Sequence, residues 1–458
     1  MRRVLLLAFA LTAAAPRAHA FCGFFVGKAD AQLFNKSSQV ALVRDGDRTV
    51  LTMSNDYQGP LSEFALVVPV PSVLTRDQIH IGDRKLLERL DAYSSPRLVE
   101  YTDLDPCVVR ERSLWPMAAM PMRKDAVMGG VMDHAKAMGV TIEAAYTVGE
   151  YDILLLSAKQ SEGLEAWLRE SGYHIPPHAS RALAPYVKQD MKFFVAKVNL
   201  KEQKKAGFQE LRPIQIAYES PRFMLPIRLG MANAKGGAGS AGDGPEPKAE
   251  ADGGPQDLIV YALTRNGRVE SSNYQTVKIP SDAEVPEFVQ KDFGEFYKAA
   301  FTHAWKKHGQ RAIVTEYFWN MGWCDPCAAP PLETAELREL GVFWLQTPAT
   351  RVRGPAGMPV TLTRLHVRYD AEHFPEDLMF QETGDQQNFQ GRYVMNHPFK
   401  GKMTCDVREQ YLTSVRERRQ REASTLASLT GWSMEKIRQR MGPDAAIQPD
   451  PWWKTLWK

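Results

Sequence analysis

The feature that most restricts the fold is a strand-like run in residues 312–332 that leads directly into a Trp-Cys-Asp-Pro-Cys motif. A Cys-x-x-Cys pair after a strand is one form that thiol–disulfide redox sites take. At a helix N-terminus, unpaired backbone N–H groups and the helix dipole lower the pKa of a thiol and make it a nucleophile. In that interpretation Cys324 attacks and Cys327 resolves the mixed disulfide.

Three features of the sequence favour a structural disulfide at this pair instead. Pro330 and Pro331 would interrupt a helix begun at the cysteines within about its first turn. Ser, Thr and Asn caps are missing immediately before the pair, and a helix start near Thr334 is favoured. The surrounding segments are mainly hairpins and meanders, without the βαβ units of a thioredoxin-like fold. We therefore expect a loop-stiffening disulfide, and keep a thiol–disulfide oxidoreductase as the alternative.

The first twenty residues predict export. Two arginines precede an apolar run over residues 4–15, which is followed by Ala-His-Ala, a small-x-small cleavage site. The apolar run is too short to cross a bilayer. We expect residues 1–20 to be a signal peptide, cleaved between Ala20 and Phe21, and the mature chain to be periplasmic or secreted.

Five cysteines remain after that cleavage, an odd number for a compartment in which thiols pair. The sequence leaves their connectivity open; the disulfide candidates are Cys22, Cys107, Cys324, Cys327 and Cys405. A zinc site is a further alternative, because three cysteines and one histidine form a common ligand set. Its ligands would be Cys324, Cys327, Cys405 and His397, although Cys405 lacks a paired ligand of its own. We expect no cofactor.

The net charge excludes one class of partner. The formal charge is +3, and the signal peptide carries three arginines and no acid, so the mature chain would be neutral. Without a basic excess we expect no nucleic-acid binding. Membrane-surface contact through an amphipathic C-terminus is a weaker alternative, because basic residues there exceed acidic ones only slightly. The residues concerned are Trp452, Trp453, Lys454, Trp457 and Lys458.

The hydrophobic pattern predicts an α+β protein rich in antiparallel strands. Asp45-Gly46 and Asn266-Gly267 each separate two strand-like runs and predict β-hairpins. Residues 360–369 alternate apolar and polar side chains, as expected of a strand. The apolar stripe over residues 284–308 predicts one strong amphipathic core helix.

Two further segments bear on the domain organisation. Residues 233–256 consist mostly of Gly, Ala, Pro and charged residues. Such a segment is typical of a domain linker, but strand patterns follow it, so we expect an insertion between strands of one sheet at least as readily. Residues 406–458 predict a charged helical tail that follows a region spanning residues 21–405.

Other signs of catalysis or metal binding are weak. The sequence contains no Gly-x-Ser-x-Gly, His-Glu-x-x-His or phosphate-binding glycine motif. The methionines of residues 117–138, with His134, could hold Cu(I), but their spacing does not repeat and a loop is favoured. An acid-rich cluster after strand 360–369 could bind Ca²⁺, yet a solvated turn is favoured. Its members are Asp370, Glu372, His373, Glu376 and Asp377.

Several segments together resemble one bacterial extracytoplasmic family, domain of unknown function 2330. The resemblance covers nearly all of residues 21–405; the Met-rich stretch, the Gly/Ala/Pro-rich insertion and the tail lie outside it. It implies a signal-bearing protein with no established catalytic residues to carry over. We expect a non-enzymatic binding or structural module. The segments that carry the resemblance are residues 21–59, 79–101, 191–200, 223–231, 322–327 and 365–383.

Overall fold

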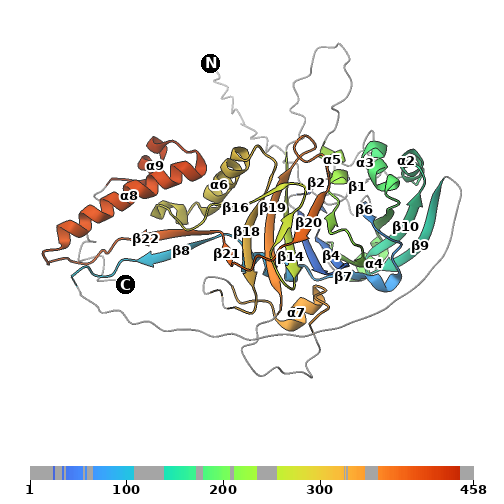
Figure 1. Cartoon of the computed structure of the whole chain (residues 1–458), viewed down its shortest axis with the longest axis horizontal. Helices are drawn as coiled ribbons and strands as arrows, with labels where there is room; N and C mark the ends of the chain where they lie inside the picture. Colours follow the sequence, from blue (N-terminus) through green and yellow to red (C-terminus); the bar gives the residue numbers. More distant parts are fainter. Residues whose placement is uncertain are drawn as a thin grey trace, which may run out of the picture.

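The predicted α+β class is confirmed by a computed structural model. It describes residues 24–25, 34–35, 38–54, 57–58, 65–107, 139–171, 179–206, 211–234, 255–323, 325, 329–345 and 359–443. Two large β-sheets occupy the centre and one end of an elongated molecule, and a pair of helices extends from the other end (Figure 1).

The largest sheet has nine strands and mixes parallel and antiparallel pairs. Its spatial order is β16 (Gln275–Lys278), β18 (Ala312–Asn320), β19 (Thr361–Tyr369), β14 (Gln256–Thr264), β3 (Ser38–Asp45), β4 (Arg48–Ser54), β12 (Ile214–Glu219) and β7 (Ile79–Ile81), and β21 (Phe389–Gln390) pairs with β18.

A second sheet is antiparallel throughout. Its order is β1 (Phe24–Phe25), β6 (Ala65–Val70), β11 (Lys192–Val198), β10 (Tyr151–Ala158) and β9 (Val140–Val148). The smaller sheets are β13 (Met224–Leu225) with β20 (Leu378–Glu382) and β15 (Val269–Ser271), β17 (Ala283–Glu284) with β22 (Arg392–His397) and β8 (Arg97–Thr102), and β2 (Phe34–Asn35) with β5 (Tyr57–Gln58).

The helices lie on the outer faces of the sheets and at one end of the molecule. They are α1 (Arg84–Ser94), α2 (Ser161–Glu170), α3 (Ala179–Lys188), α4 (Leu200–Ala206), α5 (Arg228–Ala234), α6 (Phe293–Lys307), α7 (Thr334–Glu339), α8 (Arg408–Thr430) and α9 (Met434–Met441), with 3₁₀ turns η2 (Arg76–Gln78) and η3 (Glu287–Gln290). Asp83 caps α1 by accepting a hydrogen bond from the backbone N–H of Lys85, as the sequence predicts.

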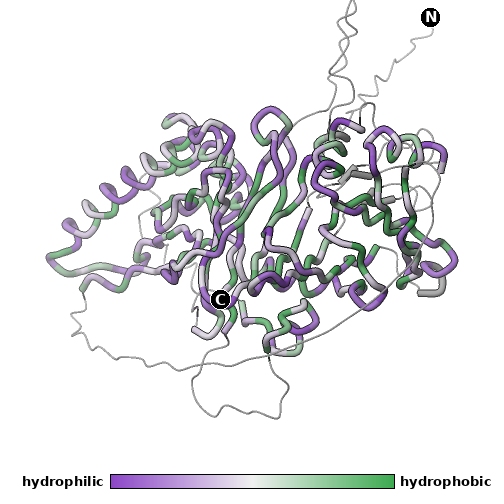
Figure 2. Tube along the Cα trace, turned by 45° about the vertical axis from the view of Figure 1, so that its right-hand side comes forward, coloured by the Kyte–Doolittle hydropathy of each residue, from purple (hydrophilic) through white to green (hydrophobic). Residues whose placement is uncertain are grey.

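Strand alternation divides the core into layers. One face of β14 packs against the five-stranded sheet through Leu258 and Val260, and the other face meets α1 and α7 through Tyr261 and Leu263. Helices α2 and α3 cover the outer face of the five-stranded sheet. The order of layers is thus helices, sheet, sheet, helices, and Figure 2 shows the hydrophobic residues concentrated in the strands.

A separate cluster holds the C-terminal helices in place. It joins α6, β22, α8 and α9 through Phe296, Tyr393, Leu426 and Ile437. The helical tail predicted from residue 406 is therefore confirmed as far as Met441, and it packs on a hydrophobic core of its own.

The hairpin at Asp45-Gly46 is confirmed, with its turn shifted by one residue. Asp45 pairs with Arg48, so Gly46 and Asp47 form the two-residue turn. Gly46 has φ +58, which glycine adopts without a steric penalty.

The hairpin predicted at Asn266-Gly267 is wrong, although the chain does turn there. Strand β14 pairs with β3 and β19, whereas β15 pairs with β20. The backbone carbonyl of Thr383 packs so closely against Gly267 that a Cβ would lie 1.9 Å from it. A long-range contact therefore directs the chain away from β14 after this turn.

The core helix predicted over residues 284–308 is shorter than expected. Residue Val285 instead donates its backbone N–H to Val394 in β22, and Pro286 precedes the 3₁₀ turn η3. The α-helix begins only at Phe293. The apolar stripe nevertheless identified buried residues correctly, because Val285 and Val289 belong to the same core as Phe296.

The last strand before the Gly/Ala/Pro-rich residues 233–256 is β13, which belongs to a three-stranded sheet. Strand β12 precedes this segment and β14 follows it, and both belong to the nine-stranded sheet. None of the helices in the described ranges is long and apolar enough to span a membrane.

Candidate functional site

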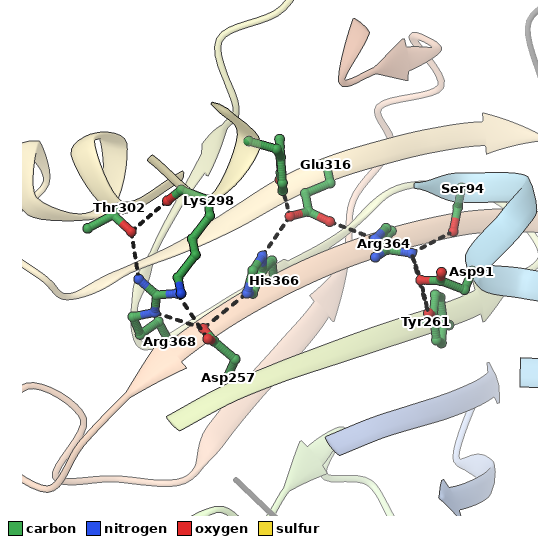
Figure 3. Close-up of polar contacts among 11 residues, drawn as sticks. Asp91, Ser94, Asp257, Tyr261, Lys298, Thr302, Glu316, Arg364, His366 and Arg368 are labelled. Carbon is green, nitrogen blue, oxygen red and sulfur yellow. Dashed lines mark hydrogen bonds and ion pairs between the residues drawn. The ribbon is translucent and has the colours of Figure 1, made fainter. Parts of the chain in front are cut away.

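Strand β19 carries three basic side chains in a row on one face. Arg364, His366 and Arg368 are two residues apart, and alternate residues of a strand point to the same side. The intervening Leu365 and Val367 enter the core between the two sheets. The basic row therefore faces the helix side of the nine-stranded sheet, under α1 and α6 (Figure 3).

Glu316 lies opposite this row at a β-bulge in β18. Thr315 pairs with Leu365 and Tyr317 pairs with Arg364, so Glu316 is the extra residue between them. A bulge bends its strand and redirects a side chain. The backbone carbonyl of Glu316 accepts a hydrogen bond of 2.7 Å from the N–H of Gly391.

The carboxylate of Glu316 is fully enclosed by hydrogen-bond donors. Its Oε1 accepts from Nδ1 of His366 at 2.7 Å and from the hydroxyl of Tyr297 on α6. Its Oε2 accepts from Nε of Arg364 at 2.6 Å. Only 1% of the Glu316 residue surface is exposed, so these contacts replace water entirely.

Two further carboxylates extend the network to its ends. Asp257 on β14 accepts from Nε2 of His366 at 3.1 Å and from Nε of Arg368 at 2.8 Å. At the other end, Arg364 donates to Asp91 on α1 at 2.6 Å. Acidic and basic groups therefore alternate along the line Asp91, Arg364, Glu316, His366, Asp257 and Arg368 (Figure 3).

Aromatic rings complete the surroundings of the basic row. The imidazole of His366 stacks on Phe301 at a centroid separation of 3.7 Å. The guanidinium of Arg368 lies over the rings of Phe301 and Trp305 on α6, and its Nη1 donates to the hydroxyl of Thr302. The network thereby ties α6 to the sheet by both charge and stacking.

The charged groups in this network keep one another ionised. Burial alone would raise the pKa of Glu316, but His366 and Arg364 outweigh it and lower the pKa to about 2. Burial likewise disfavours a charged His366, yet Glu316 and Asp257 raise its pKa above the ordinary value. A protonated imidazole donates from both nitrogens and cannot act as a base. The arrangement is suited to bracing β14, β18, β19, α1 and α6.

A groove on the same side of the sheet has the character of a ligand site. It encloses about 370 Å³ next to α7, and we call it the Arg338 groove. Apolar side chains meet polar ones along its walls, as in small-molecule sites. It is lined by Val50, Asp77, Gln78, His80, Gln215, Ala217, Arg338, Gly341, Val342, Phe343 and Leu345.

Arg338 in this groove has an unsatisfied donor. Its Nε donates to the backbone carbonyl of Leu345 at 3.0 Å. Its Nη2 is buried and has no hydrogen-bond partner among the described residues. Leaving a buried donor unpaired costs on the order of 1–3 kcal/mol, and more when the group is charged.

The structure places two of the five predicted cysteines. Cys107 and Cys405 form a disulfide, with Cα atoms 5.6 Å apart and a sequence separation of 298. Cys22, Cys324 and Cys327 lie outside the described residues. Because the sulfur of Cys405 is bonded to Cys107, the four-ligand zinc alternative loses one of its thiolates.

His397 also has partners other than the cysteines. Its Nε2 lies 2.9 Å from Glu100 and its Nδ1 lies 3.4 Å from Glu287. Among the described residues, no group of three or more His, Cys, Asp or Glu side chains could hold a metal ion. The Met-rich residues 117–138 and the Trp/Lys-rich end of the tail lie outside the described part of the chain.

The acid-rich cluster after β19 divides into two sets of contacts. Asp370 holds Nδ1 of His373 at 2.8 Å, beside a second cavity. Asp377 is buried and accepts from the hydroxyl of Tyr186 at 2.6 Å and from the N–H of Ile227 at 2.9 Å. The prediction of a solvated turn is therefore wrong for Asp377, which anchors the start of α5.

A family model described as an uncharacterized protein conserved in bacteria, DUF2330, matches residues 16–239 and 248–381. The match includes the Met-rich stretch, which the sequence resemblance left out, and ends before the expected boundary at residue 405. No curated protein and no solved structure matches this chain. The matched residues make up most of the sequence, and the chain therefore belongs to the DUF2330 family of uncharacterized bacterial proteins.

Proposed function

We propose that this protein is an exported, non-enzymatic binding protein whose ligand occupies the Arg338 groove. The observation that carries the proposal is the guanidinium of Arg338, which lines the groove and has one nitrogen, Nη2, without a hydrogen-bond partner among the described residues. A ligand oxyanion is the group that such a donor best accommodates, because a charged donor and acceptor form strong hydrogen bonds.

The rest of the groove favours a ligand with an apolar body. Phe343 is 41% exposed although it is a large aromatic residue, and Val342 lies beside it. The amide of Gln215 is already fixed by Thr52 at 2.9 Å, which keeps the polar wall in place. A small carboxylate with an aromatic or aliphatic body matches both walls, and a cavity of about 370 Å³ is large enough for it.

Export is supported by two independent features. The first is the signal-peptide pattern of residues 1–20. The second is the Cys107–Cys405 disulfide, because such bonds persist mainly outside the reducing cytosol.

The test compares two related probes on the Arg338→Gln variant. We expect 3-phenylpropionate to bind the wild-type protein at least tenfold more tightly than 3-phenylpropionamide, measured by isothermal titration calorimetry. Arg338→Gln should remove that preference, whereas Arg416→Gln, at an exposed arginine outside the groove, should preserve it. Equal affinities for both probes in the wild-type protein would remove the proposal.

The alternative function is a thiol–disulfide oxidoreductase, and one contact favours it. Asp325, the residue after Cys324, accepts from the hydroxyl of Tyr317 at 3.0 Å and from Nε2 of Gln390 at 2.7 Å. These bonds hold Asp325 close to β18 and β21. Cys324→Ser should abolish disulfide reductase or isomerase activity in this case, whereas a structural disulfide predicts a loss of stability alone.

A further inference from the structure

A second cavity lies at one edge of the nine-stranded sheet and encloses about 380 Å³. It is built where β16 and β18 begin and β19 ends, because β16 runs parallel and β19 antiparallel to β18. Loops placed by a rigid sheet are common sites of binding. The lining residues are Asn273, Tyr274, Gln275, Arg311, His373, Pro375 and Glu376.

The imidazole of His373 is held in this cavity from three directions. Asp370 lies 2.8 Å from its Nδ1, and the ring meets Trp305 edge to face at 6.4 Å. Its Nε2 lies 3.4 Å from the amide nitrogen of Gln310. Burial raises the pKa of Asp370, but hydrogen bonds from His373 and from backbone N–H groups outweigh it and lower the pKa below its ordinary value. Asp370 is thus an ionised anchor that orients the ring.

Two opposite charges line the same cavity without pairing with each other. Within the described ranges, neither the guanidinium of Arg311 nor the carboxylate of Glu376 forms a hydrogen bond or an ion pair. The backbone at Glu376 is nevertheless fixed, since its N–H donates to the hydroxyl of Tyr274 at 2.9 Å. The cavity therefore presents a free cation and a free anion from separate, anchored loops.

We propose that this cavity binds a small zwitterion of the α-amino acid class, with its carboxylate on Arg311 and its ammonium group on Glu376. The imidazole of His373 lies beside the carboxylate as a further polar contact, and the rings of Tyr274 and Pro375 supply apolar surface. Arg311 and Glu376 are both exposed, and a zwitterion engages both of them, whereas a simple anion or cation engages only one. This inference concerns a site separate from the Arg338 groove and does not depend on its function.

The experiment begins with the twenty free amino acids, screened individually against the wild-type protein by differential scanning fluorimetry. The best binder is then compared by isothermal titration calorimetry with two of its derivatives. The N-acetyl derivative lacks the ammonium group, and the carboxamide derivative lacks the carboxylate. We expect each derivative to bind at least tenfold more weakly than the free amino acid.

Two matched variants test which residue binds the carboxylate of the ligand and which binds its ammonium group. Arg311→Gln should weaken binding of the free amino acid about tenfold and leave binding of the carboxamide derivative unchanged. Glu376→Gln should also weaken binding of the free amino acid about tenfold, but leave binding of the N-acetyl derivative unchanged. Arg416→Gln, at an exposed arginine of α8 outside both cavities, is the control and should leave amino acid binding unchanged. Any of three results would overturn the proposal: no amino acid binds, the derivatives bind as tightly as the parent, or Arg311→Gln binds the amino acid as tightly as Arg416→Gln.

Discussion

Oε1 of Glu316 lies 2.7 Å from Nδ1 of His366, across two neighbouring strands and beneath α6. The bulge in β18 makes this contact possible, because it leaves Glu316 without a partner in the ladder and turns its carboxylate toward the basic row of β19. His366 also contacts Asp257, so it occupies the middle of a line of alternating charges. This line connects the sheet to α1 and α6.

Glu316→Gln should strongly destabilise the protein. The substitution leaves Arg364 and His366 buried beside a neutral amide, and removing one partner of a buried ion pair costs about 3–5 kcal/mol. Urea denaturation followed by far-UV circular dichroism measures the loss. Glu372→Gln, on the exposed turn after β19, is the control and should change the free energy of unfolding by less than about 0.5 kcal/mol. A similar effect of both variants would contradict a special role for Glu316.

The same contact predicts how stability depends on pH. The pKa of Glu316 is lowered to about 2, so its contribution is present above pH 4.5 and is lost as the pH falls toward 2. The pKa of His366 is raised, so its contribution is complete below pH 6.5 and is lost as the pH rises through the higher folded value. The network should therefore stabilise most between about pH 4.5 and 6.5.

Urea midpoints at pH 3, 5.5 and 8.5 check this profile. His366→Gln should flatten the alkaline side of the profile and leave part of the acidic side, because Arg364 still holds Glu316 ionised. A wild-type midpoint that rises from pH 5.5 to 8.5 by more than in His366→Gln would refute the assignment.

Glu422 on α8 should make the C-terminal helices sensitive to pH in the opposite sense to Glu316. Burial raises its pKa to about 7, because Arg418 offsets the desolvation only in part. The folded protein then binds a proton that the unfolded chain releases, so stability falls as the pH rises from about 4.5 to 7. Glu422→Gln should remove this loss, which amounts to roughly 3 kcal/mol. Amide hydrogen exchange of α8 at pH 5.5 and 7.5 measures it, with the exposed Glu417→Gln as the control.

Opening the disulfide should loosen the tail. Cys107 and Cys405 are separated by 298 positions in sequence, and the chain-entropy model gives a stabilisation on the order of 5 kcal/mol for so long a loop. The double variant Cys107→Ala/Cys405→Ala should exchange faster in α8 than in β14, because α8 begins three residues after Cys405. Uniform protection in α8 and β14 of the double variant would show that the hydrophobic contacts alone secure the tail.

Local patterns predicted much of the fold because they depend on neighbouring residues. The cap at Asp83 and the turn after Asp45 are examples, since each is determined within about four residues. The turn at Asn266-Gly267 failed as a hairpin signal because the chain pairs afterwards with β20, which is more than a hundred residues away. The spacing of residues around a turn does not reveal a distant strand that pairs with the chain instead.

The charge network was missed for a related reason, although part of its signal was visible. Alternation in β19 places Arg364, His366 and Arg368 on one face, and three basic residues on a buried strand require acidic partners. Those partners come from other strands, at Glu316 and Asp257, and the bulge that aims Glu316 has no recognisable sequence signature. The motifs that the sequence did single out, Cys-x-x-Cys and the Met-rich stretch, lie outside the described residues.

The pairing of β8 with β22 shows that the fold extends beyond the residues that match the family. The family match ends at residue 381, yet β22, which lies beyond it, completes the sheet of β8 and contributes Tyr393 to the core around α6. A protein shortened to the matched residues would expose that core and leave Cys107 unpaired. Recombinant versions of this protein should therefore extend at least to Met441, even though the family match ends some sixty residues earlier.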